Sequence, residues 1–225
     1  MPRTTRSLLL TLLLLVAAGC GSKPSLTNFH VVDDDVLVRS AQPDAVGLAK
    51  LRDDYGVRTI INLNERTTDE ELVNAMALGI DYLPMPFPTY SLSRLELVKV
   101  LAAVRQAERE GRAPVLIHCR YGQDRTGITV GLYRVVVQGW DADRAIDDMQ
   151  SKRHWTHRVV IRGYDKLLRE AEADRERWLR QIDAVGRIPI VRPPTPYEPT
   201  TTRPSGLPDA VDVPPTSQPE FLMIW

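Results

Sequence analysis

Cysteine is scarce in this chain of 225 residues, which contains only Cys20 and Cys119. One follows an apolar leader and the other lies in a loop, so each has its own explanation and we expect no disulfide between them. Net charge is also lacking, because 29 basic and 29 acidic side chains balance. Without a global positive field the chain is not expected to bind nucleic acid, and any preference for anions must come from a local site.

Long apolar segments are lacking as well. The nearly unbroken apolar run over residues 8–18, interrupted only by Thr11, is too short for a typical membrane span. Arg3 and Arg6 precede it and give the segment a positively charged start. This pattern indicates a targeting segment that takes no part in the fold.

The end of that segment, Val-Ala-Ala-Gly-Cys over residues 16–20, resembles a bacterial lipobox. The resemblance implies a lipoprotein signal peptide over residues 1–19, a lipid anchor on Cys20 and a tether over residues 20–27. Gly21, rather than an aspartate, follows the cysteine, which implies a place in the bacterial cell envelope, on the outer membrane facing the periplasm. The alternative is an ordinary secretory signal with an incidental cysteine.

Strand-like apolar runs alternate with segments of helical spacing through the middle of the chain. The expected strands are 29–32, 36–40, 57–63, 80–83 and 115–118, and the expected helices are 44–55, 69–78, 93–110, 126–138, 141–151 and 159–185. This alternation predicts an α/β fold with a central, mostly parallel sheet flanked by helices over residues 28–185. Proline then dominates residues 186–225, with ten of the 17 prolines, so we expect an extended or disordered tail there.

The segment His118–Gly127 reads HCRYGQDRTG and carries the chemistry of the chain. The apolar run Val115–Ile117 leads into it and a helix-compatible run follows, which predicts a strand, a tight loop and a helix N-terminus. Backbone N–H groups and the positive end of the helix dipole then converge on one point, where a phosphate fits. The same groups stabilise a thiolate, so one loop would bind a phosphate and hold a nucleophile against it.

Each residue type in the loop suits one part of phosphate-ester cleavage. Cys119 supplies the thiolate nucleophile, and Arg125 offers a planar fork for two phosphoryl oxygens. Gly122 permits the tight turn, and a buried His118 would fix the backbone and the thiolate by hydrogen bonds. Thr126 would stabilise the thiolate as it leaves in the second step.

The phosphate is expected to lie against the loop itself, with no metal or cofactor required. The residues assigned to its binding are Arg120, Tyr121, Gly122, Gln123 and Arg125. The histidines after the loop are not spaced convincingly for a metal ion.

The pattern His-Cys-x5-Arg-Thr-Gly resembles the signature of the protein tyrosine phosphatase superfamily, in its bacterial and atypical dual-specificity branch. Weaker similarities extend to residues 28–43, 60–63 and 114–119, so that the resemblance covers about residues 28–170. It implies hydrolysis of phosphate monoesters on phosphotyrosine or dual-specificity protein substrates through a phosphocysteine intermediate. The alternatives are an inositol polyphosphate or phosphoinositide phosphatase, and a phosphate-binding pseudophosphatase. A rhodanese-like sulfurtransferase also uses a loop cysteine, but the Arg-Thr-Gly ending fits phosphate better.

The general acid is missing from its usual place. Many relatives carry an aspartate roughly thirty residues before the nucleophile, whereas residues 87–92 contain no Asp or Glu here. Resemblance to myotubularin-like lipid phosphatases makes Asp124 the first candidate, and its alternative role is a structural partner of a nearby cation such as Arg120. Asp81 is the second candidate, with a solvent-facing position as its alternative.

Two features bear on the substrate. Arg120 adds a positive side chain to the loop, and a basic run follows as Lys152, Arg153, His154, His157 and Arg158. Either could meet the additional phosphates of an inositol phosphate. The alternative for the basic run, which we favour slightly, is a solvated helix start.

Overall fold

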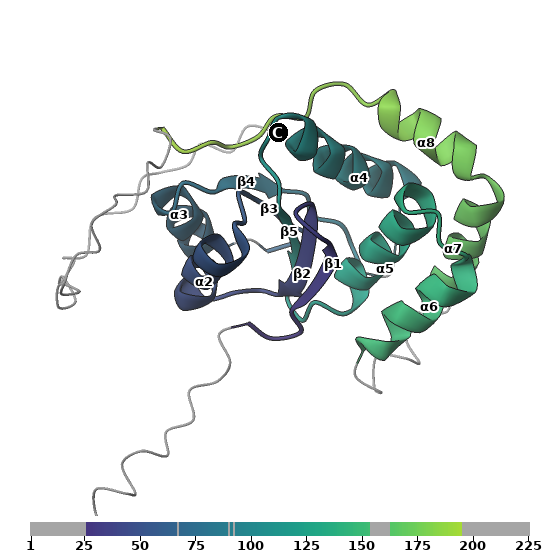
Figure 1. The fold of residues 1–225 in the computed structure, drawn as a ribbon, viewed down its shortest axis with the longest axis horizontal. Helices are drawn as coiled ribbons and strands as arrows, with labels where there is room; N and C mark the ends of the chain where they lie inside the picture. The colour runs from purple at the N-terminus through teal and green to yellow at the C-terminus, as the bar shows by residue number, and fades with distance from the viewer. Residues whose placement is uncertain (1–25, 67, 90, 92, 154–162, 195–225) are drawn as a thin grey trace, which may run out of the picture.

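A five-stranded sheet forms the centre of the structure, a computed structural model that describes residues 26–66, 68–89, 91, 93–153 and 163–194 (Figure 1). Its strands lie in the order β1-β2-β5-β3-β4. They are β1 (His30–Asp33), β2 (Leu37–Ala41), β3 (Thr59–Asn62), β4 (Asp81–Pro84) and β5 (Val115–Cys119). The β1–β2 pair is antiparallel and the other pairs are parallel, so the expected α/β fold with a mostly parallel sheet is confirmed.

Helices cover both faces of this sheet. Helices α2 and α3 lie on one side, and the remaining helices lie on the other (Figure 1). Their bounds are α2 (Ala45–Tyr55), α3 (Asp69–Ala77), α4 (Arg94–Arg109), α5 (Asp124–Leu132), α6 (Ala142–Ser151), α7 (Tyr164–Ala173) and α8 (Arg175–Asp183), with a π-helical turn η2 (Tyr133–Val137) after α5. No helix in the described part of the chain has the length and apolarity needed to cross a membrane.

The alternation of side chains along β5 explains the two layers. Val115 and Ile117 belong to the core under α4 to α8, whereas Leu116 belongs to the core under α2 and α3. Successive residues of a strand point to opposite faces of the sheet, so an unbroken apolar run is what a strand covered on both faces requires. His118 continues the α3 side and Cys119 the other side, and the chemistry therefore begins where the strand ends.

Two of the expected helices differ from the observed ones. The helix expected over 159–185 is two helices in its described part, because Asp174 takes φ −128° and ψ 38° between α7 and α8. The break lets α7 pack on α5 and α6 while α8 packs on α4. The helix expected over 126–138 begins earlier, at Asp124, and ends in the π-helical turn η2.

The start of the proline-rich segment packs against the domain. Ile188 exchanges two hydrogen bonds with the side chain of Gln106 on α4, at 2.9 and 3.1 Å. Val191 forms an antiparallel bridge with Tyr82 on the edge strand β4. These contacts cover the free edge of β4 with an extended segment. The rest of the tail, from residue 195, lies outside the described residues.

Candidate active site

The loop Arg120–Gln123 connects the C-terminal end of β5 to the first turn of α5. Strand β5 has parallel neighbours on both sides, so the carboxyl ends of β2, β3 and β5 meet at the edge where this loop lies. Open α/β sheets bind ligands at this edge. Cys119, the last residue of β5, has only 4% of its surface exposed. The predicted nucleophile is thus at the base of the site, beside the positive end of the α5 dipole.

Gly122 is the point at which the loop touches the rest of the domain. It has φ +65°, and a Cβ at this position would lie 2.5 Å from the Ser40 carbonyl oxygen in β2. Its own carbonyl accepts hydrogen bonds from the Arg39 guanidinium and, at 2.9 Å, from Asn28 Nδ2. The expected role of Gly122 in a tight turn is consistent with this conformation, and the backbone of β2 adds a second requirement for glycine.

Arg39 is a residue beneath the loop that sequence reasoning did not assign to the site. It is fully buried beneath the loop, and burial lowers the pKa of its guanidinium to about 10. It is therefore still charged at neutral pH, and its positive charge lies near Cys119. The sequence did not indicate that Arg39 is buried, because a basic residue in a predicted strand is expected to face solvent. Its apolar neighbours Leu37 and Val38 indicated only the strand.

Arg125 is held at the site by main-chain carbonyls from two other loops. Its Nη1 donates hydrogen bonds to the carbonyl oxygens of Leu63, at 3.0 Å, and Phe87, at 3.4 Å. The same nitrogen lies 3.7 Å from Glu65 Oε2. These contacts fix the guanidinium at the ends of β3 and β4, where it can present its fork to a phosphate bound by the loop.

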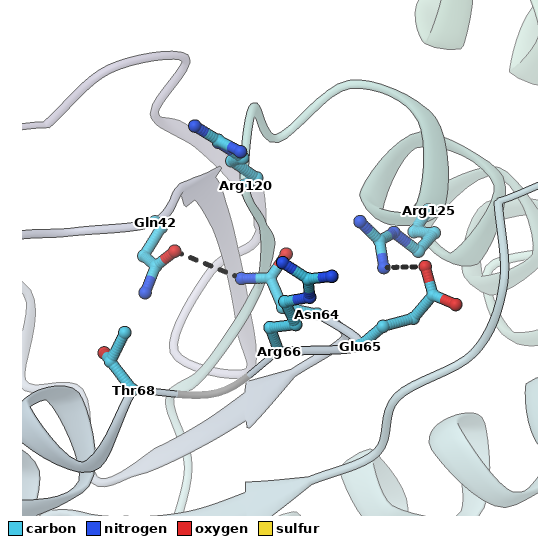
Figure 2. A pocket seen from close by; sticks show the side chains of 7 residues that line it. All are labelled: Gln42, Asn64, Glu65, Arg66, Thr68, Arg120 and Arg125. Atoms are coloured by element: carbon cyan, nitrogen blue, oxygen red, sulfur yellow. Dashed lines mark hydrogen bonds and ion pairs between the residues drawn. The ribbon is translucent and has the colours of Figure 1, made fainter.

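A pocket of about 610 Å³ opens between these elements, lined by Gln42, Asn64, Glu65, Arg66, Thr68, Arg120 and Arg125. Figure 2 shows Arg120 and Arg125 on opposite sides of it, with Glu65 directed toward Arg125. A second pocket, of about 440 Å³, shares Gln42, Thr68 and Arg120 and is also lined by Tyr121, whose side chain is exposed. The charge around the first pocket is mainly positive, so it suits an anionic ligand.

A buried polar network lies directly under the loop, on the α3 side of the sheet. His118 Nε2 lies 2.7 Å from Glu71 Oε1, although the two are not aligned as a regular hydrogen bond. The other oxygen of Glu71 accepts hydrogen bonds from Gln42 at 2.8 Å and Asn62 at 3.0 Å. Because Gln42 also lines the pocket, this network connects the residue before the nucleophile to the pocket wall. Sequence reasoning missed Glu71, which resembled any other acidic residue at the start of a helix.

His118 and Thr126 are both buried. The expected hydrogen bonds of His118 to the backbone and the thiolate are not formed among the described residues, because its ring faces Glu71 on the α3 side of the sheet and neither ring nitrogen has a hydrogen-bond partner. Thr126 Oγ1 has no hydrogen-bond partner among the described residues, which leaves it available for another group. Gln123 is the N-cap residue of α5 and makes no side-chain capping bond. The guanidinium of Arg120 lies 5.4 Å from the centre of the Tyr121 ring. Of the loop residues assigned to the phosphate, Arg120, Tyr121 and Arg125 line the two pockets, whereas Gly122 packs against β2.

Both candidates for the general acid are engaged elsewhere. Asp124 Oδ1 accepts hydrogen bonds from Arg153 Nη2, at 2.7 Å, and from Arg153 Nε, at 3.2 Å. The alternative role of Asp124 as the structural partner of a nearby cation agrees with this contact, although the cation is Arg153, whereas Arg120 lines the pocket. Within the basic run, Arg153 thus serves the loop, and residues 154–162 lie outside the described residues.

Asp81 is neither solvent-facing nor near the site. It begins β4, is buried, and pairs with Arg112 through contacts of 2.8 and 2.9 Å. The amino end of β4 lies opposite the edge that carries the loop, because β3, β4 and β5 run parallel. Its partner Arg112 precedes β5, so the pair ties the far edge of the sheet together and does not reach the site.

No group of three or more His, Cys, Asp or Glu side chains is placed to hold a metal ion in the described ranges. The site instead combines one cysteine, one clamped arginine and a helix N-terminus. This is the combination that binds a phosphate and attacks it with a thiolate.

Residues 26–174 match the family described as Swiss Army Knife protein, DSP-PTPase phosphatase domain. The chain belongs to this family. The match agrees with the resemblance drawn from the loop motif and includes every residue assigned to catalysis or phosphate binding. The match therefore places the chain in the cysteine-based phosphatase superfamily. It does not include Cys20, so it does not bear on the lipid anchor.

Individual relatives support the same assignment. The chain is 36% identical over 127 residues to dual specificity protein phosphatase TpbA of Pseudomonas aeruginosa, covering 56% of this chain and 55% of the relative. It is 30% identical over 134 residues to inositol diphosphatase DSP5 of Arabidopsis thaliana, covering 55% of this chain and 60% of the relative. The chain thus spans little more than half the length of these curated relatives.

Solved structures agree on the fold. The crystal structure of P. aeruginosa TpbA superposes with a TM-score of 0.53 at 29% identity, covering 68% of this chain and 95% of that one. The core catalytic domain of the PP-IP phosphatase SIW14 from S. cerevisiae superposes with a TM-score of 0.57 at 22% identity, covering 70% and 98%. The second likeness shows the fold alone.

Proposed function

We propose that this chain hydrolyses phosphate monoesters through a phosphocysteine intermediate. The observation that carries the proposal is the juxtaposition of Cys119, at the end of β5, with the clamped guanidinium of Arg125 at the N-terminus of α5. The thiolate attacks phosphorus, and the arginine and the loop N–H groups hold the phosphoryl oxygens. Water then cleaves the phosphocysteine and restores the thiolate.

The leading substrate is a protein carrying phosphotyrosine, with phosphoserine or phosphothreonine as dual-specificity substrates. The TpbA relative, a dual specificity protein phosphatase, supports this choice. The test is phosphate release from phosphotyrosine peptides, phosphoserine peptides and inositol phosphates by reduced enzyme. Tight phosphate binding without release from any of these would identify a pseudophosphatase instead.

An inositol polyphosphate or phosphoinositide is the second candidate, and the pocket favours it. Arg66 and Arg120 line the same cavity as Arg125, so phosphates beyond the reacting one would meet two further guanidinium groups. The DSP5 relative, an inositol diphosphatase, is compatible with this reading.

The two arginines give a discriminating prediction. Replacing Arg66 and Arg120 together by alanine should raise KM for inositol hexakisphosphate by about 10-fold or more, because a charged hydrogen bond contributes roughly 1.5–3 kcal/mol. KM for a phosphotyrosine peptide whose only charged group is the phosphate should change less than about 3-fold if that phosphate is held by the loop and Arg125. Equal effects on both substrates would contradict the second candidate. Steady-state kinetics on the two substrates measures the difference.

We also propose that the mature protein is a lipoprotein held by a lipid on Cys20 at the periplasmic face of the outer membrane. The lipobox-like residues before Cys20 support this placement. Several acyl chains give stable anchoring, whereas one gives only marginal binding. In a Gram-negative host expressing the full chain, Cys20→Ser should therefore move the protein from the membrane fraction to the soluble fraction and abolish labelling by an alkyne fatty acid. Unchanged fractionation and labelling of this variant would refute the anchor.

A further inference from the structure

The proposed hydrolysis leaves one role unfilled, namely the proton donor for the leaving oxygen. The two aspartates that the sequence suggests are bound by Arg153 and Arg112. No Asp or Glu occurs over residues 84–92, between the end of β4 and the start of α4. The acid, if the chain supplies one, must therefore come from another element that reaches the pocket.

We propose that Glu65 is the general acid of this site. It lies in the loop after β3 and lines the 610 Å³ pocket together with Arg120 and Arg125. The carboxylate is directed toward Arg125, with Oε2 3.7 Å from Nη1 (Figure 2). Its side chain is 57% exposed, so the carboxyl group is accessible from solvent, whereas Cys119 is only 4% exposed. An in-line attack from the buried thiolate would expel the leaving group toward solvent, where such a carboxyl group can protonate it.

The electrostatics of the pocket favour Glu65 over Asp124 for this role. Asp124 accepts two hydrogen bonds from a guanidinium and has a side chain only 13% exposed, so a proton would have to displace that partner. Among the described side chains, only that of Arg125 lies within ion-pair distance of the Glu65 carboxylate, at 3.7 Å. A phosphate bound by the loop and Arg125 would lie beside this carboxyl group, because both line the same pocket.

The proposal rests on the proposed phosphatase activity and completes its two steps. In the first, the Cys119 thiolate forms the S–P bond, the P–O bond to the leaving group breaks, and the Glu65 proton goes to that oxygen to give the free alcohol. In the second, the Glu65 carboxylate takes a proton from a water molecule whose oxygen attacks phosphorus. The S–P bond breaks, the thiolate is restored, and inorganic phosphate leaves.

A purely positioning role is the competing explanation, in which Glu65 only orients Arg125. The two roles differ in their dependence on the leaving group. A missing acid harms alkyl phosphates, whose leaving oxygen must be protonated, far more than 4-nitrophenyl phosphate, whose leaving group departs as a stable anion. Loss of arginine positioning harms both substrates to the same extent, because both present the same phosphoryl group.

The test is Glu65→Gln, which keeps the shape and hydrogen-bonding capacity of the side chain. We expect kcat/KM on an alkyl phosphate to fall by about 10²-fold or more and kcat/KM on 4-nitrophenyl phosphate to fall by less than about 5-fold, in keeping with the usual contribution of a general acid. In the wild type, kcat on the alkyl phosphate should fall at high pH, because the acid must be protonated to act. This fall should be absent in Glu65→Gln. Glu172→Gln, on the exposed side of α7 and outside the pocket, is the matched control.

The outcomes separate this proposal from the proposed function. Equal losses on both substrates would overturn the acid role and leave Glu65 as a partner of Arg125. A selective loss in Asp124→Asn, with none in Glu65→Gln, would overturn it in favour of the aspartate. If the wild type releases no phosphate from 4-nitrophenyl phosphate, the proposed function itself fails.

Discussion

Replacing Cys119 by serine should abolish phosphate release and leave the fold and phosphate binding intact. The serine hydroxyl is close in size to the thiol but is not ionised near neutral pH, so the nucleophile is lost. Cys119 is almost completely buried at the end of β5, so a side chain of similar size occupies the same space without disturbing the fold. We expect kcat to fall by a factor on the order of 10³ or more, which corresponds to about 4 kcal/mol of transition-state stabilisation.

The measurement has two parts and one matched control. Phosphate release from 4-nitrophenyl phosphate gives the loss of turnover, and calorimetric titration with a phosphotyrosine peptide shows that binding persists. Cys20→Ser, at the other cysteine of the sequence, should keep full activity in detergent-solubilised protein. Activity of Cys119→Ser within about 10-fold of the wild type would contradict a covalent phosphocysteine mechanism.

The sheet and the loop could be predicted because their signals are local. Val115, Leu116 and Ile117 form an apolar run that is typical of a strand covered on both faces, and both faces are in fact covered. The spacing of Cys119 and Arg125 is set by one tight loop, so a single contiguous segment carried the function. The observed start of α5, at Asp124, lies two residues before the expected start, because helix starts are weakly specified by sequence.

The partners of the loop could not be predicted because they come from elements far away in the sequence. Arg39 is adjacent to Gly122 only because β2 pairs with β5, and Glu71 reaches His118 only because α3 covers that face. Neither has a periodicity or motif of its own. The sequence offered Asp124 and Asp81 as the acid, whereas the folded pocket is lined by Glu65 from the end of β3. Strand order, which joins these residues, is a property of the folded sheet.

The contact between the loop and β2 leads to the second large prediction, that Gly122→Ala should disrupt the site. The position has φ +65°, and a Cβ would lie 2.5 Å from the Ser40 carbonyl oxygen and 2.6 Å from the Ala41 nitrogen. Both are backbone atoms of β2, which is paired along its length with β5 and cannot yield without breaking the ladder. The positive φ costs an alanine about 1–2 kcal/mol, and overpacking typically adds about 1–3 kcal/mol.

Gly111→Ala supplies the matched control. Gly111 has φ +66°, nearly the same backbone conformation, but a Cβ there meets no atom within 4 Å. The control therefore carries only the backbone cost, and any further loss in Gly122→Ala reports the clash with β2. We expect the control to keep its activity and Gly122→Ala to lose more than about 10²-fold, because a displacement of about 1 Å in catalytic groups costs that much. Thermal unfolding should show Gly122→Ala below the control by several degrees, since 1 kcal/mol shifts Tm by about 2–4 °C in a protein of this size.

The comparison also decides how the loop is built. If the two alanine variants were equally stable and equally active, the loop would tolerate separation from β2, and the hydrogen bonds from Arg39 and Asn28 to the Gly122 carbonyl would have no bearing on catalysis. If only Gly122→Ala loses activity, the phosphate site depends on close contact with the neighbouring strand. In that case the nucleophile loop owes its geometry to β2 as much as to its own sequence, because the backbone N–H groups that bind phosphate are aimed by the carbonyl that Arg39 and Asn28 hold.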